Sequence, residues 1–227
     1  MGLYDFQRQV YERLAEGRSV ILQAPTGAGK TRAALYPFLR AWEYEEDFPR
    51  KCIYSVPLRV LANQFWDEYE GRARNFGFTR PLHVTIQTGA RPEDPRLEGN
   101  LIFTTVDQTL SNFLNIPYAL SLGQGNLNAG AVLSSFLVFD ELHLFHPGTT
   151  LPTVLHLLRL LRGVDLTLPG DCLAAHTDYD ERNEAERKAG HELGSKRPNH
   201  AAEGAAAAMD WLLDHVGDQA LARAALT

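Results

Sequence analysis

Residues 23–31, Gln-Ala-Pro-Thr-Gly-Ala-Gly-Lys-Thr, combine a glycine-rich turn with a lysine and a hydroxyl, directly after an apolar run. Gly27 and Gly29 allow the backbone to curl so that successive N–H groups point at phosphate oxygens. A helix that begins near Lys30 adds the positive end of its dipole. The Lys30 ammonium can then reach the β- and γ-phosphates of a nucleotide, and the Thr31 hydroxyl can bind Mg²⁺. The residues of this predicted ATP and Mg²⁺ loop are Ala24, Pro25, Thr26, Gly27, Ala28, Gly29, Lys30 and Thr31.

Asp140, with Glu141 next to it, follows four apolar residues and lies 110 residues after Lys30. Two adjacent acids in such a place are hard to explain as a plain solvated strand end. Asp140 can bind the same Mg²⁺ as Thr31, and Glu141 can orient and activate the water that attacks the γ-phosphate. The alternative is that the loop is a glycine-rich turn that binds nothing. That alternative does not explain why two acids follow the apolar run.

Strand-like and helix-like segments alternate over the first 163 residues. Helical spacing of Phe6, Val10 and Leu14 predicts a helix over residues 4–15. Short, nearly continuous apolar runs predict strands that are covered on both faces. The expected strands lie at about 19–23, 52–56, 83–87, 101–105 and 135–139, and the expected helices follow the phosphate loop and lie at about 59–73, 106–114 and 150–162. This alternation predicts an α/β fold with a mainly parallel sheet, whose ligands bind beyond the carboxyl ends of the strands.

The chain changes character at Gly163. Residues 1–163 carry 16 Lys/Arg and 16 Asp/Glu, whereas residues 164–227 carry 6 and 12, together with four of the eight histidines. The second part shows no convincing strand and is expected to form helices over about 177–192, 199–215 and 218–225. We therefore expect an ATP-binding lobe over residues 1–163 and a small helical region over residues 164–227.

The composition excludes several classes of protein. The two cysteines lie far apart, so neither a disulfide framework nor a zinc site is indicated. No apolar run is long enough to cross a membrane, and the N-terminus has neither a basic segment nor an apolar signal core. These features predict a cytoplasmic protein without a membrane partner. The net charge of −6 argues against a passive coat on DNA, but it does not exclude a motor that holds nucleic acid in a narrow groove.

The two motifs resemble those of superfamily 2 DExH-box helicases, and specifically the CRISPR-associated helicase–nuclease of type I systems. The loop form Ala-x-x-Gly-x-Gly-Lys-Thr is typical of helicases, and residues 140–143, Asp-Glu-Leu-His, are similar to the family's Asp-Glu-x-His box. Gln7 matches the glutamine that reads adenine in the family. Two flanking segments, 128–132 and 143–145, favour the CRISPR branch.

Three further segments, 55–62, 87–89 and 103–108, match motifs that contact nucleic acid in the family. The candidate contacts in them are Arg59, Thr88, Gly89, Thr104 and Thr105.

This resemblance covers about residues 4–162 and implies a RecA-like lobe of an ATP-dependent DNA helicase or translocase in CRISPR antiviral defence. It implies Lys30, Asp140 and Glu141 as catalytic residues, with single-stranded DNA and a CRISPR surveillance complex as partners. His143 would couple the nucleotide site to the nucleic acid, or else is a packed, hydrogen-bonded histidine. The candidate nucleic-acid contacts could likewise be ordinary strand-end turns.

Two alternatives remain for the function. One is a general superfamily 2 DNA or RNA helicase fragment, and the other is a non-catalytic scaffold that nucleotide binding switches. The second RecA-like lobe, with its arginine fingers, is absent from this sequence, so ATP hydrolysis by this chain alone is expected to be weak. The segment 166–169 stands about where the family has a strand that ends in Ser-Ala-Thr.

The tail has a weaker resemblance to the HD nuclease domain that accompanies this helicase. The similar pieces are residues 174–176, 190–196 and 197–201. In the family a His-Asp pair and further histidines hold two metal ions, but here Glu192 replaces the Asp and the later ligands are missing. We therefore expect an incomplete remnant in which His176, His191 and His200 hold no metal pair.

Overall fold

Seven strands form one sheet in the computed structural model, which describes residues 2–25, 27–75, 77–163, 173–178 and 221–225. The strands are β1 (Ser19–Ala24), β2 (Cys52–Val56), β3 (Val84–Gln87), β4 (Leu101–Thr105), β5 (Phe136–Phe139), β6 (Leu173–Asp178) and β7 (Leu221–Ala225). Their order across the sheet is β3-β4-β2-β5-β6-β1-β7, and every pairing between these strands is parallel. The expected α/β fold with a mainly parallel sheet is confirmed.

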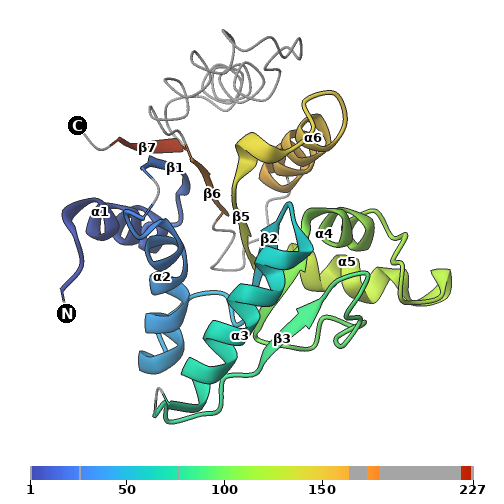
Figure 1. Ribbon diagram of the computed structural model, residues 1–227, viewed down its shortest axis with the longest axis horizontal. Coiled ribbons are helices and arrows are strands. Elements are labelled where there is room, and N and C mark those ends of the chain that lie inside the picture. The colour runs from blue at the N-terminus through green and yellow to red at the C-terminus, as the bar shows by residue number, and fades with distance from the viewer. Residues whose placement is uncertain (1, 26, 76, 164–172, 179–220, 226–227) are drawn as a thin grey trace, which may run out of the picture.

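Helices cover the two faces of the sheet (Figure 1). They are α1 (Asp5–Ala15), α2 (Lys30–Tyr44), α3 (Arg59–Asn75), α4 (Val106–Phe113), α5 (Gly125–Leu133) and α6 (Thr150–Gly163). Side chains of β1 alternate between the faces: Val20 and Leu22 belong to the core cluster that includes residues of α1, α2 and α3, whereas Ile21 belongs to the cluster that includes residues of α4, α5 and α6. None of the helices in the described ranges is both long and apolar enough to cross a membrane.

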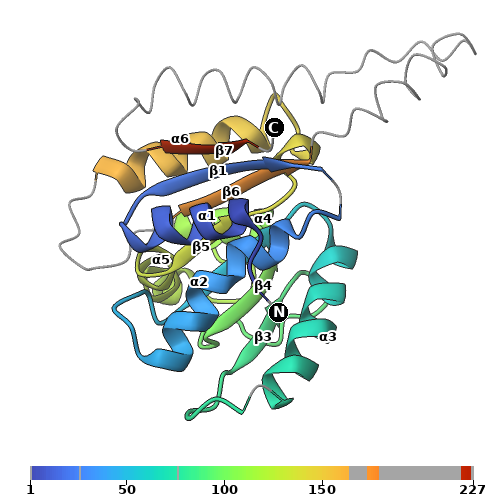
Figure 2. The same cartoon turned by 90° about the vertical axis from the view of Figure 1, so that its left-hand side faces the viewer.

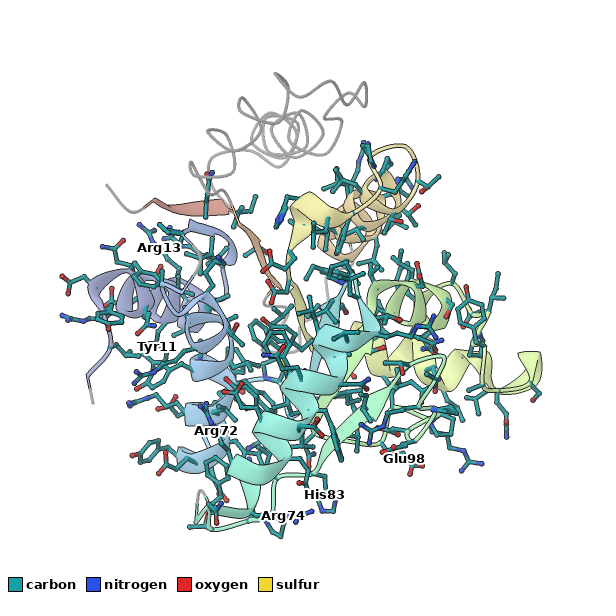
Figure 3. All side chains as sticks on the ribbon, viewed as in Figure 1. Tyr11, Arg13, Arg72, Arg74, His83 and Glu98 are labelled. Atoms are coloured by element: carbon teal, nitrogen blue, oxygen red, sulfur yellow. The ribbon has the colours of Figure 1, made fainter. Side chains whose placement is uncertain are left out.

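Helix α1 has the buried face that its sequence predicts, with Phe6, Val10 and Leu14 almost inaccessible to solvent. Figure 3 labels Tyr11 on this helix. An edge-to-face contact joins Tyr11 to Tyr36 of α2, with ring centroids 5.5 Å apart, and the guanidinium of Arg40 lies 5.4 Å from the Tyr11 ring. These contacts fix α1 against α2, so the start of the chain is held beside the loop that precedes α2.

Helix α5 is not among the expected elements. Its sequence, Gly-Asn-Leu-Asn-Ala-Gly-Ala-Val-Leu, has two glycines and no apolar repeat of helical period. The helix is instead held by Val132 in the core and by the buried Asn128, whose amide donates to the Pro95 carbonyl at 2.8 Å and to Asn112 Oδ1 at 2.6 Å. Tertiary contacts therefore decide the local structure here.

The second part of the chain adds two strands to the sheet, so the expectation of no strand after Gly163 is wrong. Strand β6 lies between β5 and β1, and β7 pairs with the other edge of β1 (Figure 2). The expected helix at 218–225 is a strand over Leu221–Ala225, and His176 pairs in register with Leu22 rather than standing in a helical remnant. The segments 166–169 and 199–215, and most of 177–192, lie outside the described residues, as do His191, Glu192 and His200. The division of the chain at Gly163 and the HD-like remnant stay predictions.

Candidate functional site

The loop between β1 and α2 has the backbone that a phosphate-binding turn requires. Gly27 has φ +78° and Gly29 has φ +90°, both in the left-handed region that favours glycine. Gly29 is also the N-terminal cap of α2, so the free N–H groups of that helix open toward the loop. A Cβ atom on Gly29 would lie only 2.7 Å from Gln7 Nε2. Thr26 lies outside the described residues, and its predicted part in the loop stays a prediction.

Replacing Gly29 with alanine is expected to lower the free energy of unfolding by about 1–2 kcal/mol, because a left-handed alanine is strained and its methyl group displaces Gln7. The control is Gly71→Ala within α3, where a Cβ meets nothing within 4 Å and a small gain in stability is expected. Urea unfolding of both variants, followed by circular dichroism, gives the comparison. Equal stability of the two proteins would contradict the strained geometry of the loop.

Lys30 is the first residue of α2, and its side chain is turned toward the loop. Its Nζ donates hydrogen bonds to the carbonyl oxygens of Ala24 at 3.0 Å and Pro25 at 3.3 Å. The side chain is almost fully buried. Ionised phosphate oxygens are stronger acceptors for an ammonium group than neutral carbonyls, so a phosphate bound in the loop can compete for this lysine.

Gln7 is buried, and it joins α1 to the phosphate loop. Its Nε2 donates to the Gly29 carbonyl at 3.1 Å, and its Oε1 accepts from the Tyr4 N–H at 3.1 Å. The second bond caps the start of α1. Gln7, the predicted adenine-reading residue, therefore links the phosphate loop to the start of α1 through hydrogen bonds. A shift of the loop backbone at Gly29 would act directly on α1.

Asp140 follows β5 and is held by two neighbouring residues of β2. Its N–H donates to the Ser55 carbonyl at 2.9 Å, and its Oδ2 accepts from the Tyr54 hydroxyl at 2.6 Å. The side chain is 2% exposed. Thr31 is also a hydrogen-bond partner of the Tyr54 hydroxyl. Thr31 and Asp140, the two predicted Mg²⁺ ligands, are far apart in the sequence but both contact the Tyr54 hydroxyl.

Burial, and then the negative charge of Asp140, raise the pKa of Tyr54 well above its usual value. The phenol therefore keeps its proton and donates it to the carboxylate. Sequence reasoning did not identify Tyr54, because within an apolar strand a tyrosine looks like one more core residue. Its hydrogen-bond partners, rather than the apolar pattern of its strand, distinguish Tyr54 from the other core residues.

Glu141 has a left-handed backbone, with φ +55°, which is uncommon for a residue other than glycine. Its Oε2 lies 3.3 Å from Nδ1 of His143, and each side chain is about one-fifth exposed. The turn after β5 therefore separates the two acids: Asp140 points into the sheet edge, and Glu141 is placed beside His143 with access to solvent.

The donor chemistry of this edge fits Mg²⁺ with a nucleotide. Mg²⁺ prefers oxygen ligands, usually one or two from the protein with the rest from phosphates and water. Thr31 offers a hydroxyl and Asp140 a carboxylate, and both touch Tyr54. Elsewhere in the described part of the chain, no group of three or more His, Cys, Asp and Glu side chains is arranged to hold a metal ion.

The predicted nucleic-acid residues lie at the carboxyl ends of β2, β3 and β4, on the same edge of the sheet, but they differ in exposure. Arg59 and Gly89 are exposed, which leaves them available for contacts. Thr88 and Thr104 are buried: Thr88 Oγ1 accepts from the Arg91 N–H at 3.1 Å, and Thr104 Oγ1 donates to the Gln87 carbonyl at 2.7 Å. These two hydroxyls stabilise the turns, so their part in binding a nucleic acid would be indirect.

The loop after β3 is organised around a buried carboxylate that sequence reasoning also missed. Asp94 Oδ2 accepts from Thr85 Oγ1 at 2.7 Å and from the Gly99 N–H at 2.9 Å, and Oδ1 accepts from the Glu98 N–H at 2.7 Å. The Asp94 N–H in turn donates to Gln87 Oε1 at 3.1 Å. This network fixes the loop that presents Gly89.

Comparisons with known proteins show the family and the fold. The profile of the DEAD/DEAH box helicases matches residues 4–174. The putative CRISPR-associated nuclease/helicase Cas3 of Methanocaldococcus jannaschii is 27% identical over 184 residues, which are 72% of this chain and 23% of that protein. The ATP-dependent DNA helicase Hel308 of Thermoplasma acidophilum is 32% identical over 164 residues, which are 69% of this chain and 21% of that protein.

The chain therefore spans less than a quarter of the length of either relative. Among solved structures, the DUF1998 helicase MrfA bound to DNA and AMPPNP aligns with a TM-score of 0.57 and 20% identity, over 78% of this chain and 24% of that one. At this identity the likeness establishes the fold alone.

Proposed function

Because the chain belongs to the DEAD/DEAH box helicase family, we propose that it is the ATP-binding lobe of an ATP-dependent DNA helicase or translocase. The observation that carries the proposal is the meeting of two motifs at one sheet edge. Lys30 and Thr31 follow β1, Asp140 and Glu141 follow β5, and Tyr54 contacts both Thr31 and Asp140. Such a pairing of a phosphate loop with carboxylates serves phosphoryl transfer.

In this proposal each residue has one role. Lys30 and the loop N–H groups hold the phosphates, while Thr31 and Asp140 hold Mg²⁺, which would neutralise charge on the β- and γ-phosphates. Glu141 orients the attacking water and accepts its proton. Gln7 reads adenine, and its hydrogen bond to Gly29 would transmit that contact to the loop. Full turnover would also need a second RecA-like lobe, since arginine fingers contribute about 10³–10⁵-fold in phosphoryl transfer.

We further propose single-stranded DNA as the substrate and CRISPR antiviral defence as the setting. The Cas3 relative supports that setting, whereas the Hel308 relative equally supports a general DNA helicase. Binding to a purified type I surveillance complex on its DNA target, compared with binding to the DNA alone, tests the CRISPR setting. Equal affinity for both would favour the general helicase.

The motor function is tested by the affinity for a labelled DNA single strand, measured by fluorescence anisotropy with and without an ATP analogue. A motor lobe should bind the strand with an affinity that changes when nucleotide is present, and DNA should stimulate ATP hydrolysis. A nucleotide-switched scaffold should show neither effect.

Arg59→Ala should weaken DNA binding severalfold and make it less dependent on salt, as expected when one phosphate contact is lost. Arg74→Ala is the matched control, because Arg74 is an exposed arginine at the other end of the same helix, on the side of His83 (Figure 3). Equal losses in both variants would argue against a specific contact at Arg59.

A further inference from the structure

Tyr54 lies at the centre of β2 and its ring is held rigidly. It is fully buried, and its ring centroid lies 5.4 Å from that of Phe65 and 5.5 Å from that of Phe103. Strand β2 pairs with β4 on one side and with β5 on the other. A phenylalanine would make the same packing contacts. The hydroxyl group is therefore the part of this side chain that the core does not explain.

The hydrogen bonds of that hydroxyl have a defined direction. An ionised carboxylate only accepts, so the single phenolic proton is donated to Asp140 Oδ2, at 2.6 Å. The phenol oxygen must then accept from the Thr31 hydroxyl. Once its proton is directed at Tyr54, the Thr31 oxygen presents its lone pairs elsewhere, which is the state in which a hydroxyl can bind a cation.

We propose that Tyr54 is a positioning residue for the magnesium site, holding the Asp140 carboxylate and the Thr31 hydroxyl in one fixed arrangement before the cation arrives. The inference rests on the proposed nucleotide function. Asp140 is anchored twice by β2, through its N–H to Ser55 and through its carboxylate to Tyr54. Strand β2 thus orients the residue that follows β5 and a residue of α2 together.

The test uses Tyr54→Phe, which keeps the ring and removes the hydroxyl. The cation affinity of the ADP-bound protein is measured by Mn²⁺ titration with electron paramagnetic resonance, and the affinity for ADP is measured in EDTA. Loss of an outer partner of a metal ligand typically lowers metal affinity by about 10- to 100-fold. We expect a loss in that range for Mn²⁺ and an unchanged affinity for ADP in EDTA.

The matched control is Tyr69→Phe. Tyr69 belongs to the same aromatic cluster, with its ring centroid 5.6 Å from that of Phe103, but its hydroxyl is bonded toward Arg72. This variant should bind Mn²⁺ like the wild type.

The outcomes separate the two ideas. A wild-type protein with no cation-dependent nucleotide binding would contradict the proposed function itself. A wild type that binds Mn²⁺, with Tyr54→Phe equal to it, would overturn the positioning role alone. A Tyr54→Phe protein that unfolds, or that loses ADP affinity in EDTA as well, would show that the hydroxyl supports the core and would also overturn it.

Discussion

Replacing Lys30 with alanine is expected to weaken ATP–Mg²⁺ binding by about 10- to 100-fold, because a hydrogen bond to a charged group contributes about 1.5–3 kcal/mol. The fold should be kept, since the lysine anchors the loop through the Ala24 and Pro25 carbonyls and not through the apolar core. Calorimetric titration with ATP and Mg²⁺ measures the loss, and an unchanged affinity would refute the assignment of the loop.

Lys51→Ala provides the control for this experiment. Lys51 is a half-buried lysine that donates to the carbonyls of Leu97 and Gly99, at the amino end of β2 and so at the opposite edge of the sheet. Burial lowers its pKa, as expected for a partly desolvated ammonium. Its removal should lower the free energy of unfolding and leave the affinity for ATP intact, so the pair of variants separates loss of a ligand contact from loss of stability.

Replacing Glu141 with glutamine is expected to lower ATP turnover by about 10²–10⁴-fold, because an amide cannot accept the proton of the attacking water. Nucleotide affinity should stay near that of the wild type, since the amide has nearly the same shape. DNA-stimulated ATP hydrolysis, measured with a second RecA-like lobe supplied, is the appropriate assay.

The control for Glu141 is Glu68→Gln, which changes a carboxylate on α3 that pairs with Arg72 at 2.8 Å. It should not alter turnover. If Glu141→Gln were as active as this control, another group would have to accept the proton.

Strands β1, β2 and β4 could be predicted from the sequence almost to the residue. The expected strands at 52–56 and 101–105 are β2 and β4 as observed, and β1 is one residue longer than expected. These strands are covered on both faces, so their burial appears in the sequence as continuous apolar runs. Strong local patterns of this kind leave little for tertiary contacts to decide.

Strands β6 and β7 could not be predicted in this way. Their sequences, Leu-Ala-Ala-His-Thr-Asp and Leu-Ala-Arg-Ala-Ala, are rich in alanine, which favours helices. Both strands pair with β1, so their conformation depends on a neighbour that local sequence does not contain. Helix α5 could not be predicted for the same reason, because the side-chain amide of Asn128 bonds to residues in other parts of the fold.

The residues of the candidate site likewise fall into those that the sequence predicts and those that it does not. Glycine, lysine and paired acids at fixed spacing can be read from the sequence because their chemistry depends on residue type. Tyr54 cannot be recognised in this way, because its role depends on which residues its hydroxyl group contacts in the folded protein. Thr88 and Thr104 show the converse, since their spacing suggests contacts with nucleic acid but their hydroxyls are bonded within the turns.

We propose above all that the edge formed by the ends of β1 and β5 binds ATP with Mg²⁺. Titration of the wild-type chain with ATP in a calorimeter, first with Mg²⁺ and then with EDTA, tests it most directly. We predict a single binding site whose affinity falls when Mg²⁺ is removed. No binding in either condition, or binding that is unaffected by EDTA and by Lys30→Ala, would contradict the claim.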